Sequence, residues 1–460
     1  MSTHRRTFLK VLGGGAAAGL TAGPLLRALA DPTGAGDGEF FIFIHAAGGW
    51  DVTLWADPRN EKKGLVDPAT TANTDTSTLG RWKDRAFDGT DKTFEILQPA
   101  GSKIAFGPGA GDLVDLFDRI CIVNGLAMNT VSHPDGTVFS ATGRHTQGGR
   151  VIAPSIDTVL ANELGREQTF PCVSVNFPSY YVATGSEGPG GLDRRVVPLR
   201  VGAIDSITRT LSRSELYESS ADRDAVTALL SREASELAAK SAYPDVLQGM
   251  ALQYESLQRM LGSKLQEVFS AAKLRAAHPE LDFKAKRIGG TAINAAFAIE
   301  AMRRNLVRCV SFAVGGFDTH VGSNYRFQAA LQQDLFGLVT ATVRALDGIP
   351  HPTKASAKLS DHTHLLVVSE FCRTPQINIG GGRDHYPNNS ALVVSPRFRS
   401  NFTFGKSDAE QVLPTQAGKF SDGARAIAPP DLLATFIQAF GINPAKYVRD
   451  GEVEKELLRG

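Results

Sequence analysis

The most informative stretch of this sequence is a short apolar run, Leu365–Val368, that ends at a cluster of charged residues. The run is rich in branched side chains and contains no charge, which is typical of a strand buried on both faces. Its glycine- and asparagine-rich continuation carries Glu370, Arg373, Asp384 and His385. Because open α/β sheets place their sites beyond the carboxyl ends of strands, we expect this segment to form half of an active or ligand-binding site.

Length, charge and cysteine content set only broad limits. A chain of 460 residues has room for two or three domains, although α/β folds of this size are often one domain with insertions. A net charge of +1 gives no reason to expect nucleic acid as a partner. The four cysteines do not have zinc-binding spacing, so we expect buried free thiols, with one disulfide as the alternative in an oxidising compartment.

Residues 1–30 have the pattern of an export signal. The paired arginines Arg5 and Arg6 precede a glycine- and alanine-rich apolar run, and Ala28-Leu29-Ala30 is a cleavage site of the Ala-x-Ala type. This combination predicts a twin-arginine signal, recognition by the twin-arginine (Tat) export machinery, and a mature chain that begins near Asp31 in the periplasm or outside the cell. A membrane anchor is the alternative interpretation. No later stretch is apolar for long enough to predict a membrane span.

Strand-like and helix-like segments alternate along the rest of the chain, which predicts a mostly parallel sheet with helices on both sides. The expected strands are Phe40–His45, Ile120–Val123, Cys172–Val175, Val307–Val314, Leu365–Val368 and Ala391–Val394. The expected helices are 112–119, 155–164, 288–305, 325–346 and a last one from Pro429 to about Gly441, whereas 124–150 is expected to be a loop. We expect 31–460 to be a single α/β domain, with a loop-rich insert at about 52–111 and a helical insert, scaffold or lid, at about 205–281.

Side chains of the metal-ligating type follow four of the expected strands. They are Asp51, His133, Asp318, His320, Glu370, Asp384 and His385. Imidazoles and carboxylates at one sheet edge suit zinc, manganese or iron, and could hold one ion or two. Each residue also has a structural alternative, since the aspartates could close turns and the histidines could be satisfied in loops or pairs.

Several other polar residues in these segments allow more than one interpretation. Arg144 and Arg373 are candidates for binding phosphate or sulfate, with a structural salt bridge as the alternative. His45, His145 and His364 are interpreted as structural residues.

Four motifs together carry a family resemblance. They are Gly-Gly-Trp-Asp at 48–51, Gly-Phe-Asp-Thr-His at 316–320, Ser-Glu-Phe-Cys-Arg-Thr-Pro at 369–375 and Gly-Arg-Asp-His-Tyr-Pro at 382–387. With the export signal, they resemble a family of exported bacterial proteins known as domain of unknown function 1501. That family is similar to the alkaline phosphatase and sulfatase superfamily, whose site holds two divalent metals beside a Thr, Ser or modified Cys nucleophile. The resemblance implies metal-ligand positions for Asp51, Asp318, His320, Glu370 and His385.

The chain also departs from that superfamily. No cysteine begins a Cys-x-Pro-x-Arg motif, which disfavours a formylglycine sulfatase. Aligning Thr142-Gly143-Arg144 with the Thr-Gly-Arg of sulfatases places His133 where the nucleophile would be. Glu370-Phe371 stands where related hydrolases have Asp-His, so one ligand is lost, and a missing ligand weakens a two-metal mechanism.

Two functions follow from these observations. The leading hypothesis is an exported hydrolase of phosphate or sulfate esters, acting on a small-molecule or glycan ester with zinc or manganese as its divalent metal. A water or the hydroxyl of Thr137 or Ser140 would attack, His133 would stand at the nucleophile position, and Arg144 would steady the anion. The alternative is a catalytically degenerate member of the fold that binds a glycan or an exported protein partner.

Overall fold

The computed structural model describes residues 38–59, 65–67 and 96–204 apart from 167 and 184–190, then scattered positions between 219 and 236, 270–284, and 287–459 apart from 422. The expected export signal at 1–30, much of the loop-rich insert at 52–111 and most of the helical insert at 205–281 lie outside the described residues. Within the described ranges, none of the helices combines the length and apolar character that a membrane span requires.

An eight-stranded sheet forms the centre of the unit that contains residues 38–211 and 264–460. Its order across the sheet is β10-β2-β9-β6-β1-β5-β3-β4. The strands are β1 Phe40–Ala46, β2 Ile120–Asn124, β3 Phe170–Val175, β4 Leu199–Val201, β5 Val307–Val314, β6 Thr363–Val368, β9 Ser390–Val394 and β10 Phe402–Phe404. Only β9 runs antiparallel to its neighbours among these eight, so the sheet is mostly parallel, as the sequence predicts.

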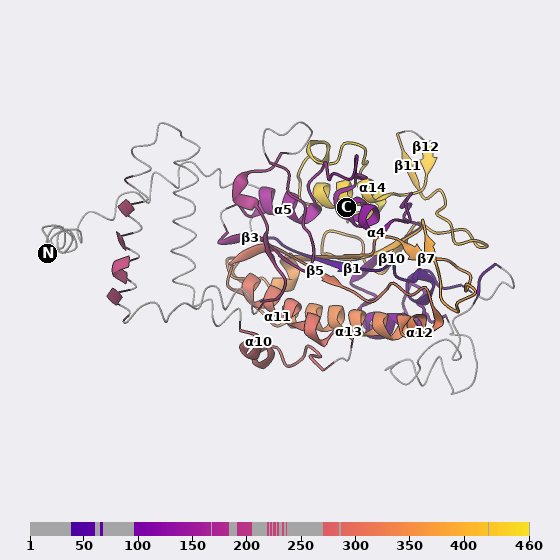
Figure 1. Cartoon of the computed structure of the whole chain (residues 1–460), viewed down its shortest axis with the longest axis horizontal. Coiled ribbons are helices and arrows are strands. Elements are labelled where there is room, and N and C mark those ends of the chain that lie inside the picture. Colours follow the sequence, from indigo (N-terminus) through magenta and orange to yellow (C-terminus); the bar gives the residue numbers. More distant parts are fainter. Residues whose placement is uncertain are drawn as a thin grey trace, which may run out of the picture. The chain divides into compact units, whose positions relative to one another are not determined.

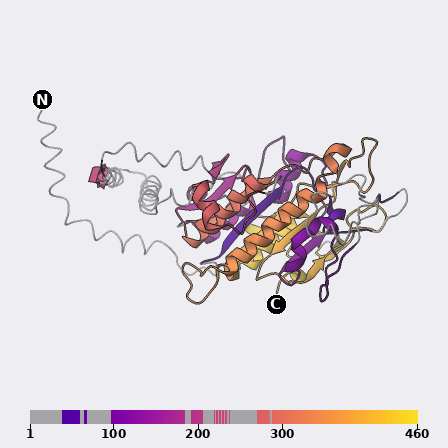
Figure 2. The same ribbon diagram turned by 90° about the horizontal axis from the view of Figure 1, so that it is seen from below.

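Helices cover both faces of the sheet (Figure 1). On one face lie α10 Ala271–Ala277, α11 Gly289–Arg303, α12 Gly322–Tyr325 and α13 Gln328–Asp347; on the other lie α4 His133–Thr142, α5 Ile156–Leu164 and α14 Pro429–Ala439. Seen from below, α13 runs across the sheet beside α11 (Figure 2). Short 3-10 helices are η1 Val52–Leu54, η3 Pro108–Leu116, η4 Arg194–Val196, η6 Leu359–His362, η7 Pro444–Lys446 and η8 Lys455–Leu457.

The central strands are buried on both faces, which explains why they contain almost no polar side chains. All residues of β1 and β6 are buried. On one face, Phe41 and Phe43 belong to the same core cluster as Phe436 of α14, and the rings of Phe41 and Phe436 lie 5.8 Å apart. The four cysteines are buried and free, so the expectation of inert core thiols is confirmed.

The expected strands are confirmed to within two residues at each end, but one expected loop is wrong. Residues 133–142 form the helix α4. Pro134 lies in its first turn, where proline costs no hydrogen bond, and Gly143 ends it with φ +70 in the left-handed region. These start and stop signals are present in the sequence, although the helix has Gly136 in its interior and lacks a strong apolar stripe. The expected helix at 325–346 corresponds to α13, which begins three residues later, at Gln328, and ends at Asp347.

Two additional hairpins complete the described fold. One pairs β7 Cys372–Arg373 with β8 His385–Tyr386, and the other pairs β11 Gly418–Phe420 with β12 Gly423–Arg425. The first hairpin begins just after Glu370 at the carboxyl end of β6. It therefore returns His385 to the edge where β1, β6 and β5 end side by side.

Candidate metal centre

Four side chains meet beyond the carboxyl ends of the central strands. His133 comes from the start of α4, Asp318 and His320 from the loop after β5, and His385 from β8. One ligand atom from each lies within 4.8 Å of all the others. From Asp318 Oδ1 the Nε2 atoms of His133, His320 and His385 are 3.6, 3.1 and 3.8 Å away. An ion with bonds of about 2.0–2.1 Å separates tetrahedral ligands by about 3.3 Å, so these spacings suit one ion.

Each histidine of this group uses its other ring nitrogen in a hydrogen bond. His133 Nδ1 lies 2.7 Å from Glu370 Oε1, and His320 Nδ1 lies 3.1 Å from Asp384 Oδ1. His385 Nδ1 donates to the carbonyl oxygen of Val131 at 2.8 Å. Carboxylates and carbonyls accept hydrogen bonds, so each Nδ1 carries the hydrogen and each neutral ring presents a lone pair at Nε2. This is the tautomer that metal binding requires.

The groups around the three Nε2 atoms are one another and the Asp318 carboxylate. His133 Nε2 is buried and has no hydrogen-bond partner among the described residues. The Nε2 atoms of His320 and His385 face each other at 2.8 Å, which needs either a shared proton or a cation between them. A metal ion would satisfy all three nitrogens and Asp318 together, whereas one proton would satisfy only two nitrogens. The residues present therefore fit a divalent metal.

Glu370 orients the His133 ring through a hydrogen bond to its Nδ1 atom. Its side chain is buried, and it accepts hydrogen bonds from Gly48 N at 2.7 Å and from Ser369 Oγ at 3.0 Å. Burial alone would raise the pKa of this carboxyl, but the hydrogen bond from His133, the nearby His45 and backbone hydrogen bonds together outweigh it and lower the pKa to about 2. Glu370 is thus a permanent carboxylate that orients the imidazole.

Arg373 holds the loops around the site together. Its side chain is fully buried, and its guanidinium donates to the carbonyl oxygens of Gly48, Gly49 and Arg383 as well as to Asp318 Oδ1 at 2.7 Å. Burial would raise the pKa of Asp318, but the hydrogen bond from Arg373 lowers it below its ordinary range. Of the two interpretations of Arg373, the structure favours the structural one, because its donors are already used.

Close backbone contacts explain two glycines near the site. Gly48 has φ +121, and a Cβ atom there would lie 2.3 Å from the backbone nitrogen of Asp318. A Cβ atom on Gly382 would lie 2.3 Å from the carbonyl carbon of His320. The second contact belongs to a short pairing of loops in which Asn378 Nδ2 also donates to the carbonyl of His320 at 2.8 Å. Glycine therefore lets the loops approach closely enough to bring His320 and His385 together.

The segment of the chain that contains the candidate metal centre matches a known protein family. The profile of the family described as "Protein of unknown function (DUF1501)" matches residues 40–452. The chain belongs to this family. The match contains every residue of the candidate metal centre.

Solved structures that match this DUF1501 protein are remote. They include a lipoteichoic acid synthase, LtaP, of Listeria monocytogenes, with 8% identity and a TM-score of 0.33 over 90% of this chain and 74% of that chain. The phosphonate monoester hydrolase of Agrobacterium radiobacter has 12% identity and a TM-score of 0.33 over 91% and 77%. A mutant TAB5 alkaline phosphatase with Mg bound has 8% identity and a TM-score of 0.27 over 77% and 91%. No curated protein sequence matches the chain.

Not all ligands expected in this DUF1501 protein lie in the group of four. Asp51 lies apart and is fully buried: Oδ1 accepts from Thr53, while Oδ2 lies 2.9 Å from Tyr325 OH and 3.1 Å from Arg383 Nη1. Glu370 and Asp384 reach the group only through His133 and His320. Of the seven residues of metal-ligating type named from the sequence, the structure brings together His133, Asp318, His320 and His385.

The candidate nucleophiles and anion-binding arginine are spread along α4 and beyond it. Thr137 lines a cavity of about 500 Å³ beside the metal centre, and its hydroxyl donates to the carbonyl of His133 at 2.8 Å. Ser140 is buried and donates to the carbonyl of Thr137 at 3.1 Å. Arg144 pairs with Asp450 at 3.0 Å. Arg144 lines a different cavity from the one beside the metal centre.

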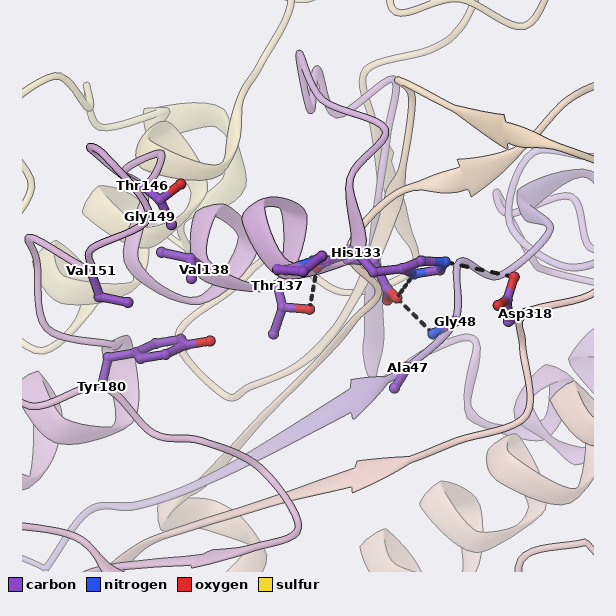
Figure 3. A pocket seen from close by; sticks show the side chains of 12 residues that line it. Ala47, Gly48, His133, Thr137, Val138, Thr146, Gly149, Val151, Tyr180 and Asp318 are labelled. Carbon is purple, nitrogen blue, oxygen red and sulfur yellow. Dashed lines mark hydrogen bonds and ion pairs between the residues drawn. The ribbon is translucent and has the colours of Figure 1, made fainter.

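The cavity extends from the metal centre along one side of α4. In Figure 3 the ring of His133 points toward Asp318, and Tyr180 and Val151 lie at the opposite end. Its wall also contains Thr146 and Gly149. Among the described residues that line it, none is a lysine or an arginine. Any negative charge on a bound group would therefore have to be balanced at the metal centre itself.

Proposed function

We propose that this chain is an exported, metal-dependent hydrolase of phosphate or sulfate esters that uses a single divalent ion. The observation that carries the proposal is the convergence of three imidazole Nε2 atoms, each with its Nδ1 hydrogen-bonded to an acceptor, on one exposed carboxylate. This arrangement supports ion binding, and the cavity beside it supports access by a substrate.

The donor set favours zinc or manganese. Three nitrogens and one carboxylate oxygen suit both ions, and calcium would be disfavoured because it prefers oxygen ligands throughout. The described residues supply one such group, which supports one ion rather than two. The Asp318 side chain is 53% exposed, so solvent or substrate could reach the ion as a further ligand. When bound, a divalent ion would act as a Lewis acid toward an ester oxygen and toward water.

Side chains of the protein would bind the ion, orient one of its ligands and contact the substrate. His133, His320, His385 and Asp318 would hold the ion, and Glu370 would keep the His133 ring in its orientation. Thr137 would contact the substrate, because its hydroxyl lines the cavity while its hydrogen is held by the carbonyl of His133. Among the described residues, no side chain that could act as a general base accepts the hydrogen of the Thr137 hydroxyl. This favours water as the attacking group.

The charge of the cavity narrows the ester class. A phosphate monoester carries about two negative charges at neutral pH, whereas a sulfate monoester or a phosphodiester carries one. A divalent ion, the Asp318 and Glu370 carboxylates, and the buried Arg373 guanidinium that donates to Asp318 together carry a net charge of about +1, and the described residues that line the cavity include no lysine or arginine. Singly charged esters are therefore the preferred substrates in this proposal.

Metal content and turnover test the proposal together. The mature chain from Asp31 would be purified without chelator, assayed for metals by elemental mass spectrometry, and tested on p-nitrophenyl sulfate, p-nitrophenyl phosphate and bis-p-nitrophenyl phosphate. We expect near-stoichiometric zinc or manganese and faster turnover of the singly charged esters. Asp318→Ala should lose both, whereas Asp118→Ala, a change at an exposed aspartate outside the site, should keep both. A metal-free, folded wild type would overturn the proposal.

A second candidate function is binding without catalysis, to a glycan or an exported protein. It is favoured by the lack of a cationic side chain among the described residues that line the cavity, since most esters of this class carry negative charge. Stoichiometric metal with no turnover on any ester would select this alternative, and saturable turnover would exclude it.

Export is part of the proposal and has its own test. The paired arginines before the apolar run are the feature that supports it. In an expressing bacterium, Arg5→Lys/Arg6→Lys should leave the chain in the cytoplasmic fraction, whereas the unchanged chain should leave it and begin near Asp31 by mass spectrometry. Equal export of both chains would exclude the twin-arginine route.

A further inference from the structure

A second histidine near α4 is held in one orientation and is not used by the metal centre. His145 Nδ1 lies 2.7 Å from Asp135 Oδ2, and Asp135 Oδ1 in turn accepts from Thr146 N and Thr146 Oγ1, both at 2.9 Å. The ring stacks on Phe139 with a centroid distance of 3.8 Å and an interplanar angle of 15°. A carboxylate at Nδ1 makes that nitrogen the donor and leaves Nε2 as an acceptor. The hydrogen bond to Asp135 and the stacking on Phe139 therefore hold the His145 ring in one orientation.

His145 lines a cavity of about 700 Å³. The same cavity is lined by the amide side chains of Asn129 and Gln147, which can donate and accept hydrogen bonds, and by the Glu452 carboxylate, which accepts them. Thr146 lines this cavity and also the one beside the metal centre, so it borders both cavities.

Both arginines that line this second cavity are paired with carboxylates. Arg144 Nη1 lies 3.0 Å from Asp450 Oδ2. Arg425 makes a bidentate contact with Asp431, at 2.6 and 2.8 Å. Because each guanidinium already faces a carboxylate and Glu452 adds a further negative charge, the lining disfavours an anion. Its donors and acceptors match an uncharged ligand whose hydroxyl groups donate and accept at once.

We propose that this cavity binds a neutral saccharide unit, with His145 Nε2 accepting from one of its hydroxyl groups. The substrate of the metal centre would then be a saccharide ester, with its sugar in the second cavity and its ester group near His133. The ester part of this statement rests on the proposed function, whereas saccharide binding does not. In this proposal His145 is a binding residue in addition to its structural contacts with Asp135 and Phe139.

Saccharide binding can be measured on the full mature chain without any ester. Saturation-transfer NMR would be recorded with maltose, cellobiose, lactose and N,N′-diacetylchitobiose. We expect at least one of them to bind the wild type, and His145→Ala to weaken that binding by about tenfold, because a hydrogen bond to a fixed ring is lost. Gln147→Ala, a change at an exposed residue of the same wall, should also weaken it and guards against a folding defect in the first variant.

His320→Ala separates this inference from the proposed function. That variant should lose metal and keep saccharide binding, whereas His145→Ala should keep metal and lose saccharide binding. No binding of any disaccharide to the wild type, or equal binding to wild type, His145→Ala and Gln147→Ala, would overturn the inference. Absence of metal with intact saccharide binding would overturn the proposed function alone.

Discussion

The Nε2 atoms of His320 and His385 lie 2.8 Å apart, while the Nδ1 atom of each ring donates a hydrogen bond elsewhere. Two neutral rings in this arrangement would place two lone pairs face to face. A cation must therefore separate them, and the nearby Asp318 and His133 make a metal ion a better solution than a proton. This relationship gives the metal centre its most direct test.

Metal should stabilise the folded chain. A ligand that binds only the native state at about a hundred times its dissociation constant contributes about 2.7 kcal/mol. We expect zinc or manganese to raise the unfolding temperature of chelator-treated wild type and to leave that of His320→Ala unchanged, as measured by calorimetry. If the two rings share only a proton, the wild type will show no metal-dependent shift.

Glu370→Gln should weaken metal binding without changing the four ligands. The substitution keeps the size of the side chain but removes the charge that orients His133, and loss of such an outer partner typically costs about 10–100-fold in metal affinity. Titration calorimetry would measure the affinity. Asp384→Asn is the matched comparison, because its carboxylate is 55% exposed and its bond to His320 is longer, so a smaller loss is expected. Equal affinities for wild type and Glu370→Gln would contradict the positioning role.

Gly48→Ala should disturb the site through the backbone. The added methyl group meets the backbone nitrogen of Asp318 at 2.3 Å, and φ +121 is strained for any residue other than glycine. We expect a loss of about 1–3 kcal/mol in unfolding free energy and weaker metal binding. Gly315→Ala is the control, since nothing lies within 4 Å of a Cβ atom there and its φ is ordinary. A Gly48→Ala chain as stable and as tightly metal-binding as that control would show that the loop can shift freely.

The sequence predicts the sheet well because burial on both faces is a local pattern. The run Val307–Val314 is β5 from its first residue to its last. The rule that sites lie at strand ends likewise selects Asp318, His320 and His385. What each carboxylate does is decided by distant partners: Asp51 faces Tyr325 and Arg383, and no local pattern shows that its oxygens are already used.

The same limit applies to the arginines and to α4. Arg373 is occupied by carbonyls of a turn far from it in sequence, whereas Arg144 faces Asp450. The helix beginning at His133 has Pro134 and Gly143 as its signals, yet its apolar residues do not repeat strongly enough to indicate a buried face. As a result, the sequence names His133 as a residue of metal-ligating type and aligns it with the nucleophile position, but predicts a loop where the structure has the start of a helix.

The ion pair between His278 and Glu300 should give the folded chain a pH-dependent stability apart from the metal centre. The ring contacts Glu300 Oε1 at 3.1 Å and links the end of α10 to α11. Burial would lower the pKa of His278, but hydrogen bonds to Glu300 and Glu280 raise it above 6.5. Burial would raise the pKa of Glu300, but the hydrogen bond from His278 lowers it from 4.5 to about 2.

These two shifts define a pH window. The raised histidine pKa contributes stability that is complete below pH 6.5 and is lost as pH rises through the folded pKa, whereas the lowered carboxyl pKa contributes stability that is complete above pH 4.5 and is lost as pH falls toward about 2. Glu300→Gln should therefore cost most between these values, about 2–3 kcal/mol by urea denaturation, and less at about pH 3 or pH 8. Asp347→Asn, which breaks the half-exposed pair with Arg119, should cost about 0–1 kcal/mol at every pH. A pH-independent loss in Glu300→Gln would mean that the contacts of Glu300 with Arg303 and Arg304, rather than its ion pair with His278, account for the effect.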